Sequence, residues 1–441
     1  MTRGLLLLLL YILVLGSPLA MSLALSHETT PSLLYELGRG LALSGATLLL
    51  LQVVLAARLK WIERPYGLDM LLRFHRNMAL LGLAMLVAHP FFLVLGGAGW
   101  SLLWSPSTPW YITAGRLALL VLAVNVAASL LRRRLKIRFE RWRFAHDMLG
   151  PLLLVLVLLH GVNAGQDLKA GLMRTAWFAS FGTIFALFAY HRIVRPTLLS
   201  RQPYRVVEVR PKAEGVWMIR LAPPKGHKRF DYLPGQFQFL TLHRHGRGLP
   251  EEEHHFTISS SPTETGYIAS TIKAVGDFTA TIGKTRPGDT ATVHAPFGRF
   301  SYLLHPRDTD MVFIAGGIGI TPLRSMLRHM HDTSAHRRTL LLYANRREQD
   351  IVFRQELDEM AAESNGRIAV VHVLSKPEPG WQGEAGHIDK DLITRLCGKD
   401  IPRKAFYLCG PPGLVRALLQ VLRKLGVPER RIRLEYFSFL D

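Results

Sequence analysis

The chain has 441 residues, of which 49% are hydrophobic, and its formal net charge is +21. This length allows two or three domains. So large a basic excess raises nucleic-acid binding as a function class, but the charges flank long apolar segments, which excludes that class in favour of a membrane protein. The two cysteines provide neither a disulfide framework nor a Cys-x-x-Cys metal motif.

Six apolar windows, all before Arg195, are each long enough to cross about 30 Å of hydrocarbon. They are Leu5–Leu25, Leu41–Ala57, Met70–Leu95, Tyr111–Leu131, Ala145–Ala164 and Thr175–Ile193. The first has a basic start, a leucine run and a Ser22-x-Ala24 pattern, so a retained helix and a cleaved signal peptide both fit it. Both interpretations start the second span outside.

Basic residues gather in the connections after the second and fourth spans and directly after the sixth. They are Arg58, Lys60, Arg64, Arg73 and Arg76, then Arg132, Arg133, Arg134, Lys136, Arg138, Arg141 and Arg143, then Arg192, Arg195 and Arg201. The connection 96–110 carries three tryptophans and no charged residue. Because basic loops stay on the cytoplasmic side, we expect a multi-pass protein of the bacterial inner (cell) membrane with its C-terminal half in the cytoplasm.

Four histidines fall in the third and fifth spans in two pairs with one spacing: His75 and His89, His146 and His160. Fourteen helical residues rise about 21 Å in nearly four turns, so the two imidazoles of a span share one face. Both spans run from inside to outside. We therefore expect His75 to meet His146 near the inner face and His89 to meet His160 near the outer face.

Ionisable side chains at membrane depth are costly and mark functional sites. Neutral imidazole is a ligand of haem iron, whereas two histidines per level lack the thiolate or carboxylate partners that zinc sites usually add. The histidines therefore predict two b-type haems, one near each membrane face. Haem propionates need cations: Arg73 and Arg76 are candidates for the inner haem, and Arg39 and Arg116 for the outer haem.

After Arg201 the sequence alternates in short runs separated by Gly and Pro, which is typical of an antiparallel β-barrel. Tyr204–Val209 and Trp217–Leu221 are the first predicted strands, and residues 295–298 close the barrel. A flavin needs an aromatic wall, donors at the ring edge and donors at the pyrophosphate. Phe256, Thr257 and Ser259 suit the first two needs, and Lys273, Gly276 and Thr279 suit the last.

A third segment predicts an open parallel α/β sheet, with ligands at the carboxyl ends of its strands. The apolar run Met311–Ala315 leads into a glycine-rich loop and then the helical Leu323–Met330, the order in which backbone N–H groups approach a pyrophosphate. Further strands are predicted at Thr339–Tyr343, Ile368–Leu374 and Phe406–Leu408. The loop residues expected to bind the nucleotide are Gly316, Gly317, Gly319, Thr321 and Pro322, with Cys409, Gly410 and Pro411 after the last of these strands.

Two details stay open at this point: which pyridine nucleotide binds, and where Phe437 lies. Arg346 and Arg347 suit the 2′-phosphate of NADPH, although exposed arginines are ordinary in a basic protein and NADH remains the alternative. Cys409 is expected to form a wall of the nicotinamide pocket, because nothing beside it in sequence activates a thiolate. Phe437 either lays its ring on the flavin or belongs to a last strand.

These motifs, in this order, resemble the ferric reductase and NADPH oxidase superfamily. The resemblance includes Phe74-His75 with His89, His146 with His160, His254-x-Phe256-Thr257, the segment 276–279, the segment 316–322 and Cys409-Gly410-Pro411. Two features differ: His255 replaces the proline of the family's flavin motif, and the interval from His146 to His160 is one residue longer than in animal oxidases. That interval equals the one in the first pair, so the ligand geometry is preserved.

The resemblance implies three domains: a six-helix transmembrane haem bundle (1–198), an FAD-binding β-barrel (199–305) and an NAD(P)H-binding α/β domain (306–441). It adds residues to the flavin site, which then comprises Pro234, Gln236, His254, Phe256, Thr257, Ile258, Ser259, Lys273, Gly276, Phe278 and Thr279. Cys409 and Phe437 are its expected catalytic residues beside the nicotinamide and flavin.

The implied activity carries electrons from cytoplasmic NAD(P)H through FAD and both haems to a small-molecule acceptor outside, either O₂ or a ferric chelate. Two other functions remain open. The protein can instead donate electrons to a periplasmic reductase partner. Alternatively, its membrane half is a haem-free anchor for an NAD(P)H diaphorase.

Overall fold

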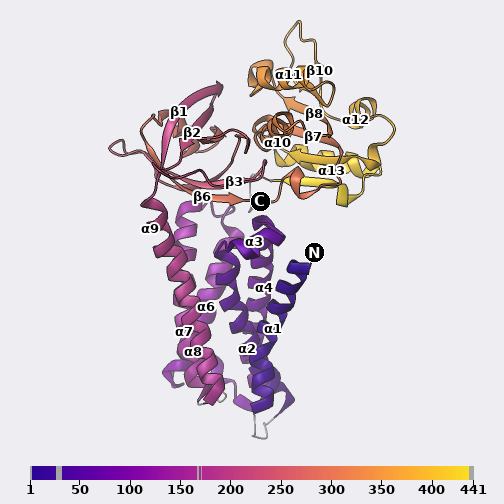
Figure 1. Ribbon diagram of the computed structural model, residues 1–441. Coiled ribbons are helices and arrows are strands. Elements are labelled where there is room, and N and C mark those ends of the chain that lie inside the picture. The colour runs from indigo at the N-terminus through magenta and orange to yellow at the C-terminus, as the bar shows by residue number, and fades with distance from the viewer. Residues whose placement is uncertain (1, 26–31, 166–167, 170, 437–441) are drawn as a thin grey trace. The chain divides into compact units, whose positions relative to one another are not determined.

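The computed structural model describes residues 2–25, 32–165, 168–169 and 171–436. The chain divides into two compact units, Met1–Pro196 and Thr197–Asp441, and each is treated by itself. The first unit is helical and the second contains two sheets (Figure 1). Phe437, a predicted catalytic residue, lies outside the described residues.

The helices of the first unit begin and end close to the predicted spans. They are α1 (Thr2–Leu25), α2 (Leu33–Ala56), α3 (Lys60–Tyr66), α4 (Leu68–Leu93), α5 (Ser101–Trp104), α6 (Trp110–Leu131), α7 (Phe139–Ala164) and α8 (Gly171–Ala189), with α9 (Arg195–Ser200) at the boundary. Among the described residues, six helices are long and apolar enough to cross a membrane. The chain is thus a multi-pass membrane protein, as its sequence predicts.

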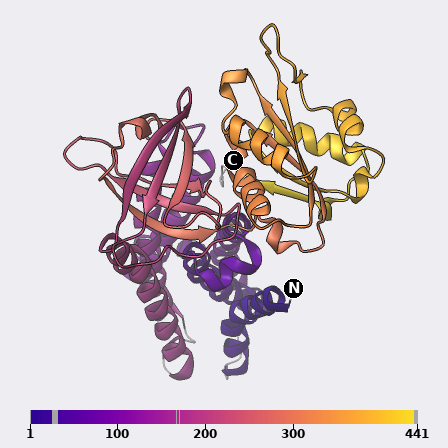
Figure 2. The same cartoon turned by 45° about the horizontal axis from the view of Figure 1, so that its top comes forward.

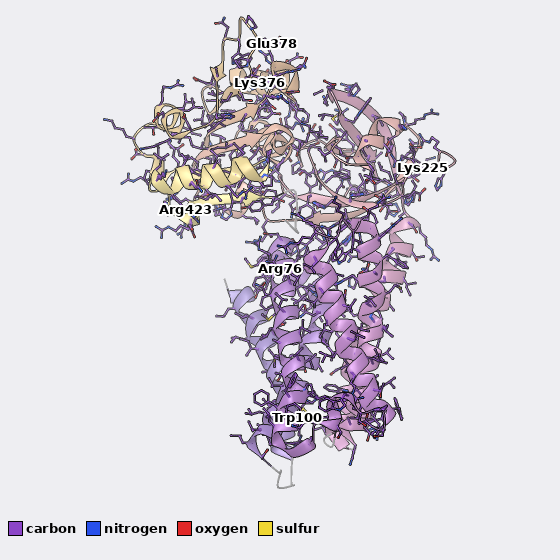
Figure 3. The ribbon with its side chains drawn as sticks, turned by 180° about the vertical axis from the view of Figure 1, so that it is seen from behind. Arg76, Trp100, Lys225, Lys376, Glu378 and Arg423 are labelled. Carbon is purple, nitrogen blue, oxygen red and sulfur yellow. The ribbon has the colours of Figure 1, made fainter. Side chains whose placement is uncertain are left out.

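Helix α2 packs along α4, and α6 packs along α7. Close approach between α2 and α4 depends on small residues, because a Cβ at Gly45 would lie 2.8 Å from the side chain of Leu86. In Figure 3, Arg76 lies at one end of the bundle and Trp100 at the other. The basic and the tryptophan-rich connections are therefore on opposite faces, as a membrane orientation requires.

The first sheet of the second unit is antiparallel, with the strand order β4-β3-β6-β1-β2-β5. Its strands are β1 (Tyr204–Ala213), β2 (Val216–Ala222), β3 (Phe237–His243), β4 (Glu253–Thr257), β5 (Ile268–Lys273) and β6 (Thr290–Phe297). The sheet curls around a core that includes Ile219, Leu240 and Ile258. The hydroxyl of Ser270 donates to the carbonyl of Thr257 at 2.8 Å, which joins its two edge strands.

The second sheet is parallel, with the order β10-β9-β8-β7-β11-β12. Its strands are β7 (Asp310–Gly316), β8 (Arg338–Asn345), β9 (Ile368–Leu374), β10 (Glu384–Ala385), β11 (Ala405–Cys409) and β12 (Ile432–Glu435). Its main helices are α10 (Ile320–Asp332), α11 (Arg354–Glu363), α12 (Lys390–Cys397) and α13 (Pro412–Lys424). Helices α10 and α11 cover one face and α12 and α13 the other (Figure 2).

The strand order changes direction at β7, which lies between β8 and β11. A sheet of this kind binds its ligand at such a switch point, beyond the carboxyl ends of the strands. The glycine-rich loop follows β7. The motif Cys409-Gly410-Pro411 begins at the last residue of the neighbouring strand, β11. The fold therefore brings the two predicted nucleotide motifs to one place.

A buried arginine joins the barrel to the parallel-sheet domain. The guanidinium of Arg324, on α10, donates to the carbonyl of Ser259 at 2.9 Å and to the carboxylate of Glu264 at 2.7 Å, both in the barrel. It also pairs with Glu356 on α11. Burial raises the pKa of Glu264, but the charge and hydrogen bond of Arg324 outweigh burial and hold that pKa below its usual range. The paired form of Glu264 is therefore the charged one.

We expect Arg324→Met to lower the thermal stability of the second unit, because it leaves the half-buried carboxylate of Glu264 without its cation. Breaking a buried pair in this way costs about 3–5 kcal/mol. Thermal unfolding of the purified protein measures the loss, and Arg395→Met, which removes the exposed ion pair with Glu384, is the matched control and should change little.

The pH dependence of this loss has a definite sign. Since the pKa of Glu264 is lowered in the folded protein, its contribution is fully present above the unfolded value of about 4.3 and disappears as the pH falls through the lowered value. The difference in stability between wild type and Arg324→Met should therefore shrink below about pH 4. A difference that grows on acidification would contradict this assignment.

Candidate functional site

The four membrane histidines form the two expected pairs. His75 and His89 lie on α4, and His146 and His160 lie on α7. The ring centroids of His75 and His146 are 6.2 Å apart, and those of His89 and His160 are 6.4 Å apart. Each level of the bundle thus presents two facing imidazoles, one from each helix.

The spacing of the rings suits one metal ion between each pair. Two metal–nitrogen bonds of about 2.0 Å, with the radius of each imidazole ring added, place two axial ring centroids roughly 6 Å apart. In three of the four rings the Nδ1 atom already contacts an oxygen of the neighbouring helix. Their Nε2 atoms are therefore the ones left for iron. The donor set and its geometry fit bis-histidine haem ligation.

Glycine at position 115 allows α6 to approach the ring of His160. A Cβ added at Gly115 would lie 2.7 Å from Nδ1 and 2.8 Å from Cε1 of that ring. Real Cβ atoms do not come so close, so any side chain here would push the imidazole aside. The sequence does not mark this residue, because a glycine within an apolar helix carries no distinguishing local signal.

The four candidate propionate arginines differ in their surroundings. Arg39 pairs with Glu36 at 2.7 Å, and Arg73 pairs with Asp69 at 2.8 Å on the surface. The guanidinium of Arg116 donates to the carbonyls of Leu102 at 2.7 Å and Ser105 at 2.9 Å. Arg76 is exposed. Arg116 therefore already anchors the connection after α4, so it has fewer donors for a carboxylate ligand.

On the barrel, the predicted flavin residues separate into an accessible group and a buried group. His254, Phe256, Lys273, Gly276 and Thr279 keep accessible surface, whereas Ile258, Ser259 and Phe278 are at most 2% exposed and Thr257 is 8% exposed. The buried side chains can support the site from behind, but they offer almost no surface to a ligand.

The support behind the surface is a stack of three side chains. The ring of Phe278 lies 4.2 Å from that of His254, nearly parallel to it, and the buried guanidinium of Arg244 lies 5.3 Å from the centre of the Phe278 ring. Nothing in the sequence pattern pointed to Arg244. The stack joins the segments around residues 254 and 278, which both belong to the predicted flavin motifs.

Two side chains organise the turns next to this stack. The amide of Gln236 donates to the carbonyl of Gly298 at 2.9 Å and accepts from the N–H of Leu233 at 2.8 Å, which fixes the turn containing Pro234. The hydroxyl of Thr279 accepts from the N–H of Gly276 at 2.9 Å. That N–H was expected to face a pyrophosphate, and in the structure it faces this hydroxyl.

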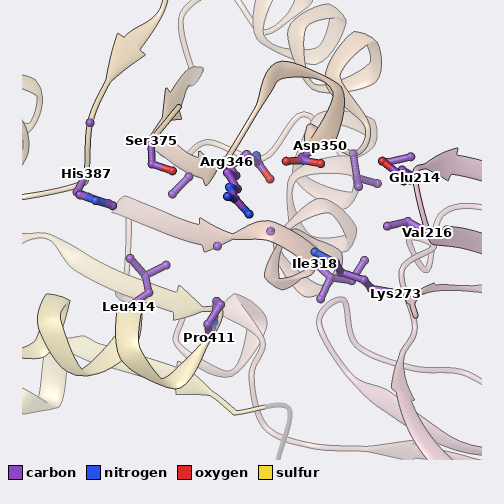
Figure 4. Close-up of a pocket in the computed structure, with 17 residues that line it drawn as sticks. Glu214, Val216, Lys273, Ile318, Arg346, Asp350, Ser375, His387, Pro411 and Leu414 are labelled. Carbon is purple, nitrogen blue, oxygen red and sulfur yellow. The ribbon is translucent and has the colours of Figure 1, made fainter. Parts of the chain in front are cut away.

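A cavity of about 240 Å³ lies at the carboxyl ends of the parallel strands (Figure 4). The lining residues come from the turn between β1 and β2, the end of β5, and the loops after β7 to β11. They include Glu214, Lys273, Gly316, Gly317, Ile318, Arg346, Asp350, Ser375, His387 and Pro411. Lys273, predicted for the flavin, therefore lines the nucleotide cavity.

Ser375, His387 and Asp350 are additions to the predicted set. Ser375 directly follows the apolar strand β9, so its place at the carboxyl end of a strand was available from the sequence. His387 follows the two-residue strand β10, which has no detectable pattern. Arg346 lines the cavity, whereas the backbone N–H of Arg347 donates to the carboxylate of Asp350 at 3.1 Å.

Glycines bring the loops after β7 and β11 together. A Cβ at Gly319 would overlap the carbonyl group of Cys409, and one at Gly316 would overlap the side chain of Leu414. The hydroxyl of Thr321 donates to the carbonyl of Ile318 at 3.1 Å and is buried. The glycines therefore act through close backbone packing, which leaves the cavity open above them.

Cys409 is buried at the end of β11, with 1% of its surface exposed. Burial raises the pKa of its thiol well above the usual range, and the charge of Glu435 adds to the rise. A protonated, buried thiol is a poor nucleophile. Cys409 belongs to the core below the loop and is not among the residues that line the cavity, so its place in the wall of the nicotinamide pocket stays a prediction.

The chain thus combines a membrane bundle with an antiparallel barrel and a parallel-sheet domain that has a cavity at the carboxyl ends of its strands. Three family models agree: Oxidoreductase FAD-binding domain matches residues 204–302, Oxidoreductase NAD-binding domain matches 313–420, and Ferric reductase like transmembrane component matches 41–157. The chain is thus an oxidoreductase of the ferric reductase type, in which this transmembrane component is fused to FAD-binding and NAD-binding domains.

Among curated relatives, the reductase component of propane 2-monooxygenase from Rhodococcus jostii (strain RHA1) is 30% identical over 242 residues, which are 53% of this chain and 63% of the relative. NADH-cytochrome b5 reductase 1 from Cryptococcus neoformans var. neoformans is 31% identical over 191 residues, 42% of this chain and 61% of the relative. The chain therefore spans less than two thirds of either relative.

Among solved structures, the cytochrome b5 reductase domain of Ulva prolifera nitrate reductase is 24% identical. The match covers 54% of this chain and 97% of that one, with a TM-score of 0.48.

The role of Gly319 is open to a direct test. Gly319→Ala should raise the KM for the pyridine nucleotide about ten- to hundredfold, since relieving such an overlap costs about 1–3 kcal/mol. Steady-state kinetics with a soluble dye as electron acceptor measures this. Gly413→Ala is the control, because a Cβ at Gly413 meets nothing within 4 Å, and an equal effect of both variants would contradict the proposed packing role.

Proposed function

We propose that the protein carries electrons across a membrane, from cytoplasmic NAD(P)H by way of FAD and two b-type haems to an acceptor on the far side. The observation that carries this proposal is the pair of facing imidazoles at each of two levels of the bundle, 6.2 and 6.4 Å apart. Transmembrane electron transfer needs such relay sites, because the hydrocarbon is too thick for one step between its faces.

When bound, FAD accepts a hydride from NAD(P)H and releases its two electrons singly, and the haems relay them. The chain's own residues bind and orient these groups. The loops held together by Gly316 and Gly319 receive the nucleotide, and Pro411 and Leu414 line the cavity beside them. The Nδ1 contacts of the histidines set which ring nitrogen faces a metal.

The charge distribution supports an outward direction. The connection 132–138 carries five basic residues and no acidic one, whereas 96–110 carries no charge. By the positive-inside rule the former is cytoplasmic, as is the reductase half that follows the sixth span. The inner pair is then His75 with His146, and the outer pair His89 with His160. The matching location is the bacterial inner (cell) membrane.

We propose O₂ or a ferric chelate as the acceptor, which makes the protein an NAD(P)H oxidase or a ferric reductase. The connections on the outer face are short and lack a cluster of carboxylates that would collect free ferric ions. This favours oxygen, with superoxide as its product, or an acceptor of broad specificity.

Haem content and acceptor use test the proposal together. The purified protein should contain two haems and one FAD per chain, and His89→Ala should lose one haem while NAD(P)H still reduces the flavin. In vesicles this variant should lose reduction of O₂ or of ferric chelates across the membrane. Wild-type protein with less than one haem per chain, or full transmembrane activity in His89→Ala, would contradict the proposal.

We further propose NADPH as the preferred donor, with Arg346 as the partner of its 2′-phosphate. Hydrogen bonds to charged groups contribute about 1.5–3 kcal/mol, so Arg346→Ala should raise the KM for NADPH about ten- to hundredfold and leave that for NADH nearly unchanged. Arg347→Ala is the matched control, because Arg346 lines the cavity and Arg347 does not. Equal loss with both nucleotides would contradict a 2′-phosphate contact.

A further inference from the structure

A second set of residues repeats the spacing of the histidines on the two neighbouring helices. Nδ1 of His89 lies 2.8 Å from the carbonyl oxygen of Gly38 on α2, and Nδ1 of His160 lies 2.8 Å from that of Tyr111 on α6. Fourteen residues further along these helices are Gln52 and Asn125. Helix α2 thus supplies an oxygen that faces a histidine of α4, and α6 supplies one that faces a histidine of α7.

The outer pair is supported by the backbone. A carbonyl oxygen only accepts hydrogen bonds, so the ring nitrogens that face Gly38 and Tyr111 must carry the proton. In His89 and His160 the lone pair is therefore on Nε2. Side-chain replacement on α2 or α6 does not remove a backbone carbonyl. The protonation pattern of the outer pair is therefore insensitive to most substitutions.

The inner pair is supported differently. Nδ1 of His146 lies 2.9 Å from Oδ1 of Asn125, a residue that is 8% exposed. The hydroxyl of Ser129 donates to the backbone carbonyl of Asn125 at 2.7 Å and accepts from the indole N–H of Trp142 at 3.1 Å. Ser129 thus links Trp142 on α7 to the backbone at Asn125, and the amide oxygen of Asn125 is the acceptor for His146.

His75 faces Gln52, where two buried groups are each without a hydrogen bond among the described residues. One is Nδ1 of His75 and the other is Oε1 of Gln52. The backbone of Gln52 is the group that approaches the ring of His75. The side-chain amide of Gln52 instead donates to the carbonyl of Leu48 at 3.1 Å. His75 is therefore faced by backbone, as the outer pair is, and Asn125 is the side chain that distinguishes the inner pair.

We propose that Asn125 is a positioning residue that accepts the Nδ1–H group of His146, so that one amide side chain sets the redox potential of the inner haem alone. This inference rests on the proposed bis-haem site. An acceptor at Nδ1 makes the imidazole a stronger electron donor to iron and favours the oxidised metal. Removing the acceptor therefore raises the potential of that haem, and strengthening it lowers the potential.

Potentiometric titration of the purified full-length protein, with the two haems resolved by their absorption spectra and electron paramagnetic resonance, tests the proposal. Asn125→Leu removes the acceptor at similar volume and should raise one of the two midpoint potentials. Gln52→Leu keeps the backbone that approaches His75 and should move neither. Asn125→Asp keeps an acceptor of greater strength and should lower the potential that Asn125→Leu raises. The other haem should keep its potential and its resonance signature throughout.

Tyr111→Phe is the matched control, because His160 contacts the backbone of Tyr111 and this substitution retains that carbonyl. It should move neither potential. Ser129→Ala changes packing beside Asn125 and leaves the amide oxygen, so it should shift the inner potential less than Asn125→Leu does. If Asn125→Leu binds only one haem, the lost haem must be the inner one, and Asn125→Asp must retain both.

The two proposals fail in different ways. Wild-type protein without two haems overturns the proposed function. Wild-type protein with two haems, whose potentials both stay unchanged or move together in Asn125→Leu and Asn125→Asp, overturns only the assignment of Asn125. A shift in Gln52→Leu as large as that in Asn125→Leu also overturns the assignment of Asn125.

Discussion

The hydrogen bonds between imidazole Nδ1–H groups and oxygens of the neighbouring helices are the constraint on which the membrane half depends. In hydrocarbon an unsatisfied polar group costs several kcal/mol. The Nδ1–H group of a histidine inside a span therefore needs a hydrogen-bond acceptor. The partners lie on α2 and α6, which pack along the helices that carry the histidines. The packing of the bundle therefore also decides which imidazole nitrogen stays free for the proposed metal sites.

In the second unit, close contacts of the backbone rather than of side chains shape the nucleotide site. A nucleotide needs several N–H donors at one point, which requires two loops to meet more closely than side chains permit. Gly316 and Gly319 allow this at the place where the strand order reverses. The Arg324 pairs then join this domain to the flavin barrel, so that the nucleotide cavity is lined by residues of both.

Much of this was predictable because the signals are periodic or local. The spans follow from continuous apolar windows, and the pairing of His75 with His146 follows from a fourteen-residue interval and the direction of two helices. The strand Ile368–Leu374 was predicted to the residue, and the other predicted strands begin or end up to four residues away. Gly115, Arg244 and His387 were not found, because each owes its place to a neighbour distant in sequence. Phe278 matched a flavin motif, yet its ring is buried against His254, which the motif alone does not reveal.

The sequence by itself determined the class of the protein: six spans, a ladder of four imidazoles, and two reductase domains in a fixed order, since length, charge and spacing are properties of the chain alone. Only the tertiary structure decided what stands behind each imidazole. A backbone carbonyl has no sequence signature, and an asparagine within an apolar helix has many explanations until the packing of α6 against α7 brings Asn125 to His146. The difference between the inner and outer histidine pairs therefore comes from helix packing and not from the histidines themselves.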